Sequence, residues 1–345
     1  MGSRLNSSRS ESGFTLLEVV VSVAVFTIVM GAVYGVLKVA RGGRINTNQR
    51  TEMLQNVRVG LNAIGRDAIN AGVGYPNTGA TIPDNKLTLL NLPADADTVQ
   101  DLLMPVYAGN GLDQIRGENF PGLQVFPVQA DEVTFLYVDD SFNGGKSLAI
   151  SGTSDPAGTK TILTVAAGFT NDPCTVGDIY LVANGSQYAI GVLTKKNNAN
   201  ELWFENTDPM GLNHPGAGSA LDQVTGTNIY IWKLQWVTYW VNDEDGKGTL
   251  LGTLTRRVYG GVNGTTLLNW TDQPLAFGIA NMQIQYILKD GSLKDSPATT
   301  EMDDIREVRV TVTVRSSDID PNTKQPYETS ISASFSTRNL VYEKT

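Results

Sequence analysis

A long uncharged run near the N-terminus constrains this chain more than any other feature. No charged residue occurs from Val19 to Leu37. At a helical rise of about 1.5 Å per residue, the run spans roughly 29 Å, close to the thickness of the hydrocarbon core of a bilayer. A secretory signal peptide places its apolar segment before the cleavage site. Here the run follows a short polar leader, so a cut after the leader would leave it in the mature protein.

The helical pattern continues beyond the apolar run. No proline occurs between Phe14 and Tyr75, which permits one long helix. The second half of this segment carries an apolar stripe with steps of three and four residues, made by Leu54, Val57, Leu61, Ile64 and Ala68. The sequence therefore predicts a helix over 14–72. Its first half is apolar on nearly all sides, and its second half is apolar on one side.

Gly31 and Gly35 stand four residues apart inside the run. This spacing permits close helix–helix approach. It also marks a point where the helix can unwind, because glycine costs a helix about 1 kcal/mol relative to alanine. Glycines are, in addition, common in membrane helices. The three interpretations stay open, and Gly42-Gly43 adds a second soft position.

Two stretches of different character form the predicted head, 73–345. Residues 76–225 are rich in Gly, Pro, Asn, Asp and Thr and are expected to be variable loops with short strands, with 77–130 a long insertion or several loops. Residues 226–341 are expected to form an antiparallel sheet with one solvent-exposed face, because valines alternate with polar residues from Val308 to Val314. The predicted strands are Glu132–Val138, Lys160–Ala166, Gly177–Val182, Gln187–Leu193, Asn228–Val241, Thr249–Tyr259, Asn281–Leu288, Arg306–Arg315 and Ile331–Leu340.

The strand predicted at Asn228–Val241 is unusually aromatic. One of its faces carries Tyr230, Trp232, Leu234, Trp236 and Trp240. Such a face can serve as a binding platform, but large aromatic side chains more often bury their area in a core. We expect this face to pack against the long helix.

Composition excludes several classes of function. The chain has 26 Lys and Arg against 35 Asp and Glu, a net charge of −9. A nucleic-acid groove needs a basic stripe, so nucleic acid is not an expected partner. Cys174 is the single cysteine, so the chain has no internal disulfide. The single histidine, His214, stands in a loop sequence, and no catalytic motif accompanies it. We therefore do not expect an enzyme.

Two acidic turns are weak candidates for calcium. Asp243 and Asp245 lie in one predicted turn, and Asp139 and Asp140 lie in another. Oxygen ligands crowded in this way suit Ca²⁺. Neither turn has the full spacing of a calcium loop, and hairpin turns favour Asp, Asn and Gly in any case. No firm metal site and no cofactor are predicted.

The residues in front of the apolar run form a recognisable motif, Gly13-Phe14-Thr15-Leu16-Leu17-Glu18. It resembles the processing site of type IV prepilins, with a small residue at the cut, a hydrophobic residue after it and a glutamate five positions into the mature chain. The resemblance implies a leader of residues 1–13, cleavage after Gly13, methylation of Phe14 by the prepilin peptidase, and a role for Glu18 in assembly. A plain N-terminal membrane anchor is the alternative.

A narrower resemblance covers the C-terminal part of the chain. It rests on Arg256-Arg257-Val258-Tyr259, on the segments 275–286 and 305–310, and on Ser336-Thr337-Arg338-Asn339-Leu340. These segments look like those of the PilW-type large minor pilins and of the related J-type pseudopilins of type II secretion. The middle of the chain resembles no family that we can name.

Together these features predict an α+β, pilin-like fold, in which a long N-terminal helix with a membrane-spanning first half packs on an antiparallel head. The resemblance implies a minor pilin that primes assembly of a type IV pilus or joins its tip. Its partners would be the major pilin, other minor pilins, the peptidase, the inner-membrane assembly platform and a tip adhesin. It would span the inner membrane once, with a periplasmic head, before reaching the cell surface. The alternatives are a type II secretion pseudopilin and a surface-binding adhesive head.

Overall fold

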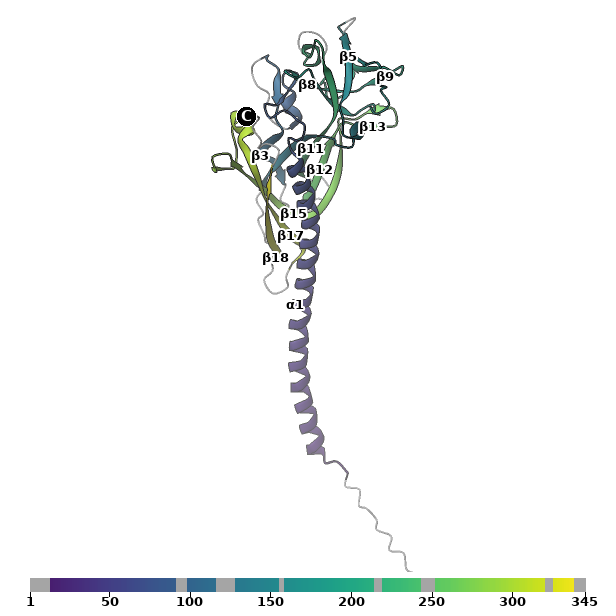
Figure 1. The fold of residues 1–345 in the computed structure, drawn as a ribbon. Helices are drawn as coiled ribbons and strands as arrows, with labels where there is room; N and C mark the ends of the chain where they lie inside the picture. The colour runs from purple at the N-terminus through teal and green to yellow at the C-terminus, as the bar shows by residue number, and fades with distance from the viewer. Residues whose placement is uncertain are drawn as a thin grey trace, which may run out of the picture.

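The computed structural model shows one long helix that carries a large, mostly β head at its C-terminal end (Figure 1). The structure describes residues 13–90, 98–115, 128–154, 158–213, 219–242, 252–319 and 325–337. This confirms the expected order of an apolar helix followed by a large antiparallel-sheet domain. The head contains much more strand than a typical pilin.

The helix α1 spans Leu16–Asn70, a total of 55 residues. It runs without a break through Gly31, Gly35 and the Gly42-Gly43 pair. It ends at Ala71, and the chain then turns through Gly72 and Gly74, whose φ angles of 79° and 65° lie in the left-handed region that glycine adopts without strain. The first half of α1 projects away from the head as a stem (Figure 1).

The remaining elements are short 3₁₀ turns and strands. The 3₁₀ turns are η1 Lys86–Leu90, η2 Phe142–Gly144, η3 Leu221–Gln223 and η4 Thr299–Asp304. The strands are β1 Ala80–Ile82, β2 Asp101–Leu103, β3 Val106–Ile115, β4 Val128–Val138, β5 Leu148–Ser154, β6 Lys160–Val165, β7 Ile179–Ala183, β8 Tyr188–Val192, β9 Lys195–Asn197, β10 Glu201–Glu205, β11 Ile229–Asn242, β12 Gly252–Tyr259, β13 Val262–Asn263, β14 Thr266–Leu267, β15 Trp270–Leu288, β16 Leu293–Lys294, β17 Ile305–Ile319 and β18 Pro326–Ser336.

Two sheets share the strand β11. Its second half pairs with β4 and β12, within a helix-side sheet of order β3-β4-β11-β12-β15-β17-β18. Its first half pairs with β5 and β7, within a distal sheet of order β2-β1-β8-β7-β11-β5-β6-β10-β9. All these pairs are antiparallel except the single parallel bridge between β1 and β8. The distal sheet has its own buried cluster around Tyr180, Leu163 and Phe204, at the end of the head farthest from the N-terminus (Figure 1).

The described part of 76–225, where variable loops with short strands are expected, holds ten strands, more than the sequence predicts. The predicted strands within it are present as β4, β6, β7 and β8, but the sequence reading missed β1, β2, β3, β5, β9 and β10. Several of these are only three residues long. Such short strands carry too little alternation to be recognised, and only pairing with their neighbours defines them.

The strands predicted after residue 226 are confirmed as β11, β12, β15, β17 and β18, with shifted ends. The alternation in β17 separates its two faces as expected. Val308, Val310, Val312 and Val314 are fully buried. On the other face, Thr311 and Thr313 make hydroxyl–hydroxyl hydrogen bonds of 2.8 Å with Ser332 and Ser330 of β18.

The second half of α1 packs on the helix-side sheet through the predicted apolar stripe. Val57, Leu61, Ile64 and Ala68 are buried, and Leu54 at the start of the stripe is half-buried. Two glycines let the helix approach closely. A side-chain carbon at Gly65 would lie 2.5 Å from Cε1 of Phe335 in β18, and one at Gly60 would overlap Leu254 of β12.

A buried carboxylate joins α1 to three strands. Asp67 has no exposed surface. Its Oδ2 accepts hydrogen bonds from Arg256 Nε of β12 and from Tyr239 Oη of β11, each at 2.7 Å. Its Oδ1 accepts from Tyr137 Oη of β4 at 3.0 Å, and also from Arg66 Nε at 3.2 Å. We call Asp67, Tyr137, Tyr239 and Arg256 the Asp67 cluster.

Electrostatics keep every donor of the Asp67 cluster protonated. Burial, and then the charge of Asp67, raise the pKa values of Tyr137 and Tyr239 well above the ordinary tyrosine value. Burial alone would lower the pKa of Arg256, but the neighbouring Asp67 carboxylate more than offsets this and raises it. The three donors Tyr137, Tyr239 and Arg256 are therefore fixed in the protonation states that their hydrogen bonds require.

The aromatic face of β11 lies on the side of the sheet away from α1, so the prediction that it packs against the helix is wrong. Tyr239, which reaches Asp67, belongs to the alternate face. Trp236, on the predicted face, stacks on Tyr259 with ring centroids 4.5 Å apart. Tyr259 in turn donates a hydrogen bond to the carbonyl of Leu89 in η1. Both faces of this part of β11 are buried by other parts of the protein. The alternation of residues alone does not tell which face packs against the helix.

Replacing Gly65 by alanine should destabilise the protein although alanine is the better helix former. The added carbon collides with Phe335, and overpacking of this kind costs about 1–3 kcal/mol. Urea unfolding of the full chain, followed by tryptophan fluorescence, measures the change. Asn62→Ala, at an exposed position of the same helical segment, is the control. A Gly65→Ala protein as stable as the control would contradict the close packing.

Replacing Asp67 by alanine should cost about 3–5 kcal/mol of unfolding free energy, because Arg256 is left buried without its counter-charge. The same urea titration measures it. Arg66→Ala removes the other charged partner of Asp67. The Arg66 side chain is 65% exposed, so this change should cost less than about 1 kcal/mol. Equal effects of the two variants would show that the Asp67 cluster does not hold the helix on the head.

Candidate functional site

The predicted processing motif leads into the first turn of α1, which begins at Leu16. Thr15 caps the helix, and its Oγ1 accepts a hydrogen bond from the Glu18 backbone N–H at 3.3 Å. The carbonyl of Thr15 accepts from the same N–H at 3.0 Å and from Val19 at 3.2 Å. A threonine cap followed three residues later by glutamate is a common way to start a helix. It places the Glu18 carboxylate at the positive end of the helix dipole.

The cleavage and methylation candidates lie at the free end of the stem. A side chain at Gly13 would meet no atom within 4 Å. Phe14 and Leu16 are both 84% exposed. Gly13 and Phe14 thus directly precede the helix that carries Glu18, and the described head takes no part in their placement.

The apolar stem is bare along its length. From Leu16 to Lys38, a stretch of 23 residues, α1 is long and apolar enough to cross a membrane, and none of this segment is buried in the protein. At about 1.5 Å per residue it measures roughly 35 Å. Its large aliphatic side chains would be solvated by water unless lipid or other protein surrounded them.

The two aliphatic hydroxyl groups within the stem are satisfied inside the helix. Ser22 Oγ donates to the Glu18 carbonyl at 2.7 Å, and Thr27 Oγ1 donates to the Val23 carbonyl at 2.8 Å. Such back-bonding removes the cost of an unpaired hydroxyl in an apolar environment. Between Glu18 and Lys38 the stem therefore presents an apolar surface apart from the Tyr34 hydroxyl.

Glu18 is the charged group at the front of this apolar surface. Its carboxylate makes no hydrogen bond or ion pair with any residue that the structure describes. An ionised carboxylate within a membrane-spanning segment costs roughly 2.5–3.5 kcal/mol on insertion scales. Such a group needs a partner from outside its own chain, or water, wherever the apolar stem is buried.

The acidic turn at Asp139 and Asp140 is organised by hydrogen bonds. The Asp139 carboxylate accepts from Ser141 N at 3.0 Å, from Ser141 Oγ at 2.6 Å and from Gln235 Nε2 at 3.0 Å. Partial burial works against ionisation, yet these donors and Lys233 lower the pKa of Asp139 below its ordinary value. Asp140 is exposed. The other candidates, Asp243 and Asp245, lie outside the described residues.

No cluster of three or more His, Cys, Asp or Glu side chains that could hold a metal occurs among the described residues. Cys174 is buried, and burial raises the pKa of its thiol from about 9 to about 11, so the thiol is protonated at neutral pH. His214 lies outside the described residues.

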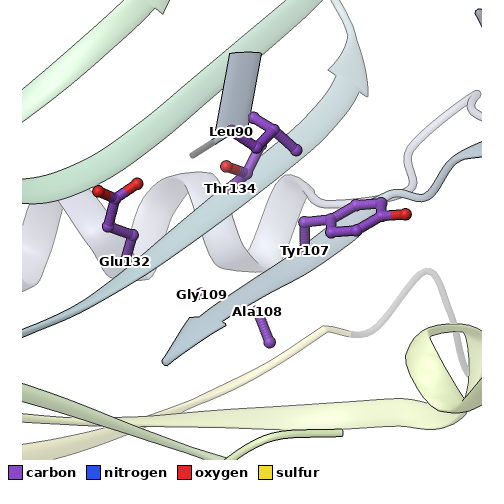
Figure 2. A pocket seen from close by; sticks show the side chains of 6 residues that line it. All are labelled: Leu90, Tyr107, Ala108, Gly109, Glu132 and Thr134. Atoms are coloured by element: carbon purple, nitrogen blue, oxygen red, sulfur yellow. The ribbon is translucent and has the colours of Figure 1, made fainter. Parts of the chain in front are cut away.

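A small cavity lies between β3 and β4, beneath Leu90 (Figure 2). Glu132 and Thr134 line it from β4, and Tyr107 and Ala108 line it from β3. Its volume of about 10 Å³ has room for a single water molecule and not for a larger ligand.

A wider hollow of about 240 Å³ opens where four segments of the head meet, one of them β2 with Leu102. Thr78 and Thr81 come from the segment around β1, Tyr188 comes from β8, and Gln223 comes from η3. The segment around β1 is more than a hundred positions from Tyr188 and Gln223 in the chain. Sequence reasoning missed the hollow because no local motif marks it.

Comparison with known proteins bears on the N-terminal segment alone. Residues 8–34 match the family model described as the prokaryotic N-terminal methylation motif. No curated protein and no solved structure matches the chain. The motif and the bare apolar helix behind it support a type IV pilin-like or pseudopilin-like protein that is processed by a prepilin peptidase and anchored in a membrane.

Proposed function

We propose that the chain is a minor pilin of a type IV pilus, which helps to prime pilus assembly or forms part of the tip complex. The observation that carries the proposal is the apolar stem, exposed from Leu16 to Lys38, with an unpartnered Glu18 at its front. A stem of this kind is suited to two environments in turn. It can cross the inner membrane before assembly and pack among other stems in a filament afterwards.

Glu18 would select the correct register during assembly. In the apolar core of a filament its carboxylate would be strongly penalised without a counter-charge. The α-amino group of a mature Phe14 on a neighbouring subunit can supply that charge, and methylation leaves the amine basic. Only one axial offset between subunits brings the two groups together, so the pair would fix the axial rise between neighbouring subunits of the filament.

The size of the head supports a minor subunit. Packed helices lie about 8–10 Å apart, whereas the head is much wider than the stem that carries it (Figure 1). A filament built from many such heads would be crowded at its surface. A subunit used in few copies, at the tip or during initiation, avoids this crowding. This argument agrees with the resemblance of 250–341 to PilW-type minor pilins.

The same geometry suits a pseudopilin of a type II secretion system, which is the second candidate because its stem faces the same physical constraint. The two are separated by whether loss of the chain abolishes surface pili or abolishes protein export. In either case the partners would be the prepilin peptidase, the inner-membrane assembly platform and other pilins, with the head in the periplasm before assembly. Calcium at Asp139 and Asp140 stays an untested prediction.

Processing should yield a mature chain that begins at Phe14 and carries one added methyl group on its amino terminus. Intact-protein and N-terminal peptide mass spectrometry of the chain from its native membrane measure this. Gly13→Leu places a bulky side chain at the cut and should leave the full leader in place. A mature terminus other than Phe14 would overturn the proposed processing.

Replacing Glu18 by alanine should reduce incorporation into filaments at least tenfold while leaving membrane insertion intact, since the apolar run is unchanged. Immunoblots of sheared filaments and of membrane fractions compare the two. Glu52→Ala removes an exposed carboxylate from the same helix outside the apolar stem and is the matched control. Normal incorporation of the Glu18→Ala chain would contradict the proposed role of this carboxylate.

A further inference from the structure

The 240 Å³ hollow lies on the β2-β1-β8 side of the distal sheet, beside η3. The turn between β7 and β8 supplies Ser186, and Asn184 fixes this turn by accepting from Ser186 N at 3.2 Å and from Gln187 N at 2.9 Å. Asn184 Nδ2 also donates to the Thr225 carbonyl at 2.8 Å, which ties the turn to the segment after η3. The walls of the hollow are therefore held by hydrogen bonds.

The lining of the hollow is uncharged. None of the ten residues that line it is acidic or basic. It combines hydroxyl and amide groups with apolar side chains such as Leu102 and Val224. The side chains of Thr78, Thr81 and Gln223 make no hydrogen bond with any described residue, so their donors and acceptors are available to a ligand.

Aromatic side chains extend from the hollow across the distal sheet. Tyr188 of β8 lies directly opposite Ala183 of β7, and Ala183 lies directly opposite Tyr230 of β11. Residues opposite one another in antiparallel strands share a face, so the two tyrosines flank a small residue at about 10 Å from each other. Tyr230 is 38% exposed, and its ring lies 6.1 Å from that of Trp232.

We propose that this hollow binds a neutral carbohydrate, one pyranose ring at a time, with Tyr188 as its stacking partner. Hydroxyl and amide groups beside an aromatic ring match a sugar, which presents hydroxyls at its rim and C–H groups on its faces. The volume lies just below the range of about 300–1,000 Å³ that holds drug-sized ligands. It therefore suits a single ring.

The chemistry of the hollow disfavours charged ligands. An anion would find no basic side chain in the lining and would approach a protein of net charge −9. A cation would find no carboxylate there. The binding does not depend on filament assembly, so it can be tested on the isolated protein and can fail while the proposed assembly role stands.

The test is saturation-transfer NMR on the purified full chain, held in a detergent without a sugar headgroup. The probes are the methyl glycosides of glucose, galactose and N-acetylglucosamine, with glucuronic acid as the charged counterpart. We expect at least one neutral glycoside to bind with a Kd on the order of 1 mM, as is usual for a ligand of this size, and glucuronic acid to bind more weakly.

Two variants probe the lining. Tyr188→Ala should weaken binding roughly tenfold, and Gln223→Ala should also weaken it, whereas Phe277→Ala, at an exposed aromatic position of β15, should leave it unchanged. If Tyr188→Ala fails to fold, Gln223→Ala decides alone, because the Gln223 side chain is exposed. Absence of binding by every neutral glycoside, unchanged binding by the lining variants, or equal binding of glucuronic acid would overturn the proposal.

Discussion

The attachment of the stem to the head depends on the hydrogen bonds and the ion pair of the Asp67 carboxylate. It sits fully buried near the C-terminal end of α1, where the helix dipole disfavours a negative charge. Tyr137, Tyr239 and Arg256 compensate that cost from three different strands. The cluster therefore fixes both the rotation of the helix and its position along the sheet. Apolar packing alone, which is not directional, would specify these less sharply.

The fixed attachment between helix and head matters because the stem is long. α1 is one unbroken helix, so any change in its orientation at Asp67 is carried to Glu18 at the other end. The two glycines at the contact, Gly60 and Gly65, bring the helix close to Leu254 and Phe335 and leave little freedom to shift. The head can thus present the stem at one angle to a membrane or to neighbouring stems.

Helix α1 carries two carboxylates with opposite surroundings, one near each of its ends. Asp67 is satisfied within its own fold, whereas Glu18 has no partner among the described residues. The first holds the protein together. The second leaves a requirement that only another molecule can meet, and under the proposed function that molecule is the next subunit.

Local signals in the sequence determined the stem and much of the sheet. The uncharged run, the proline-free segment and the Gly13–Glu18 motif lie within one continuous helix and its cap, where 3.6-residue periodicity and capping suffice. The alternation from Val308 to Val314 likewise fixed both faces of β17. Only the tertiary structure decided which side of β11 meets α1, how the ten strands in the described part of 76–225 pair, and that residues from four segments form a hollow. These features depend on long-range pairing. Asp67 stood beside the predicted apolar stripe as the one visible hint, but its three partners in the strands lie 70 to 189 positions away, and no local pattern could have brought them together.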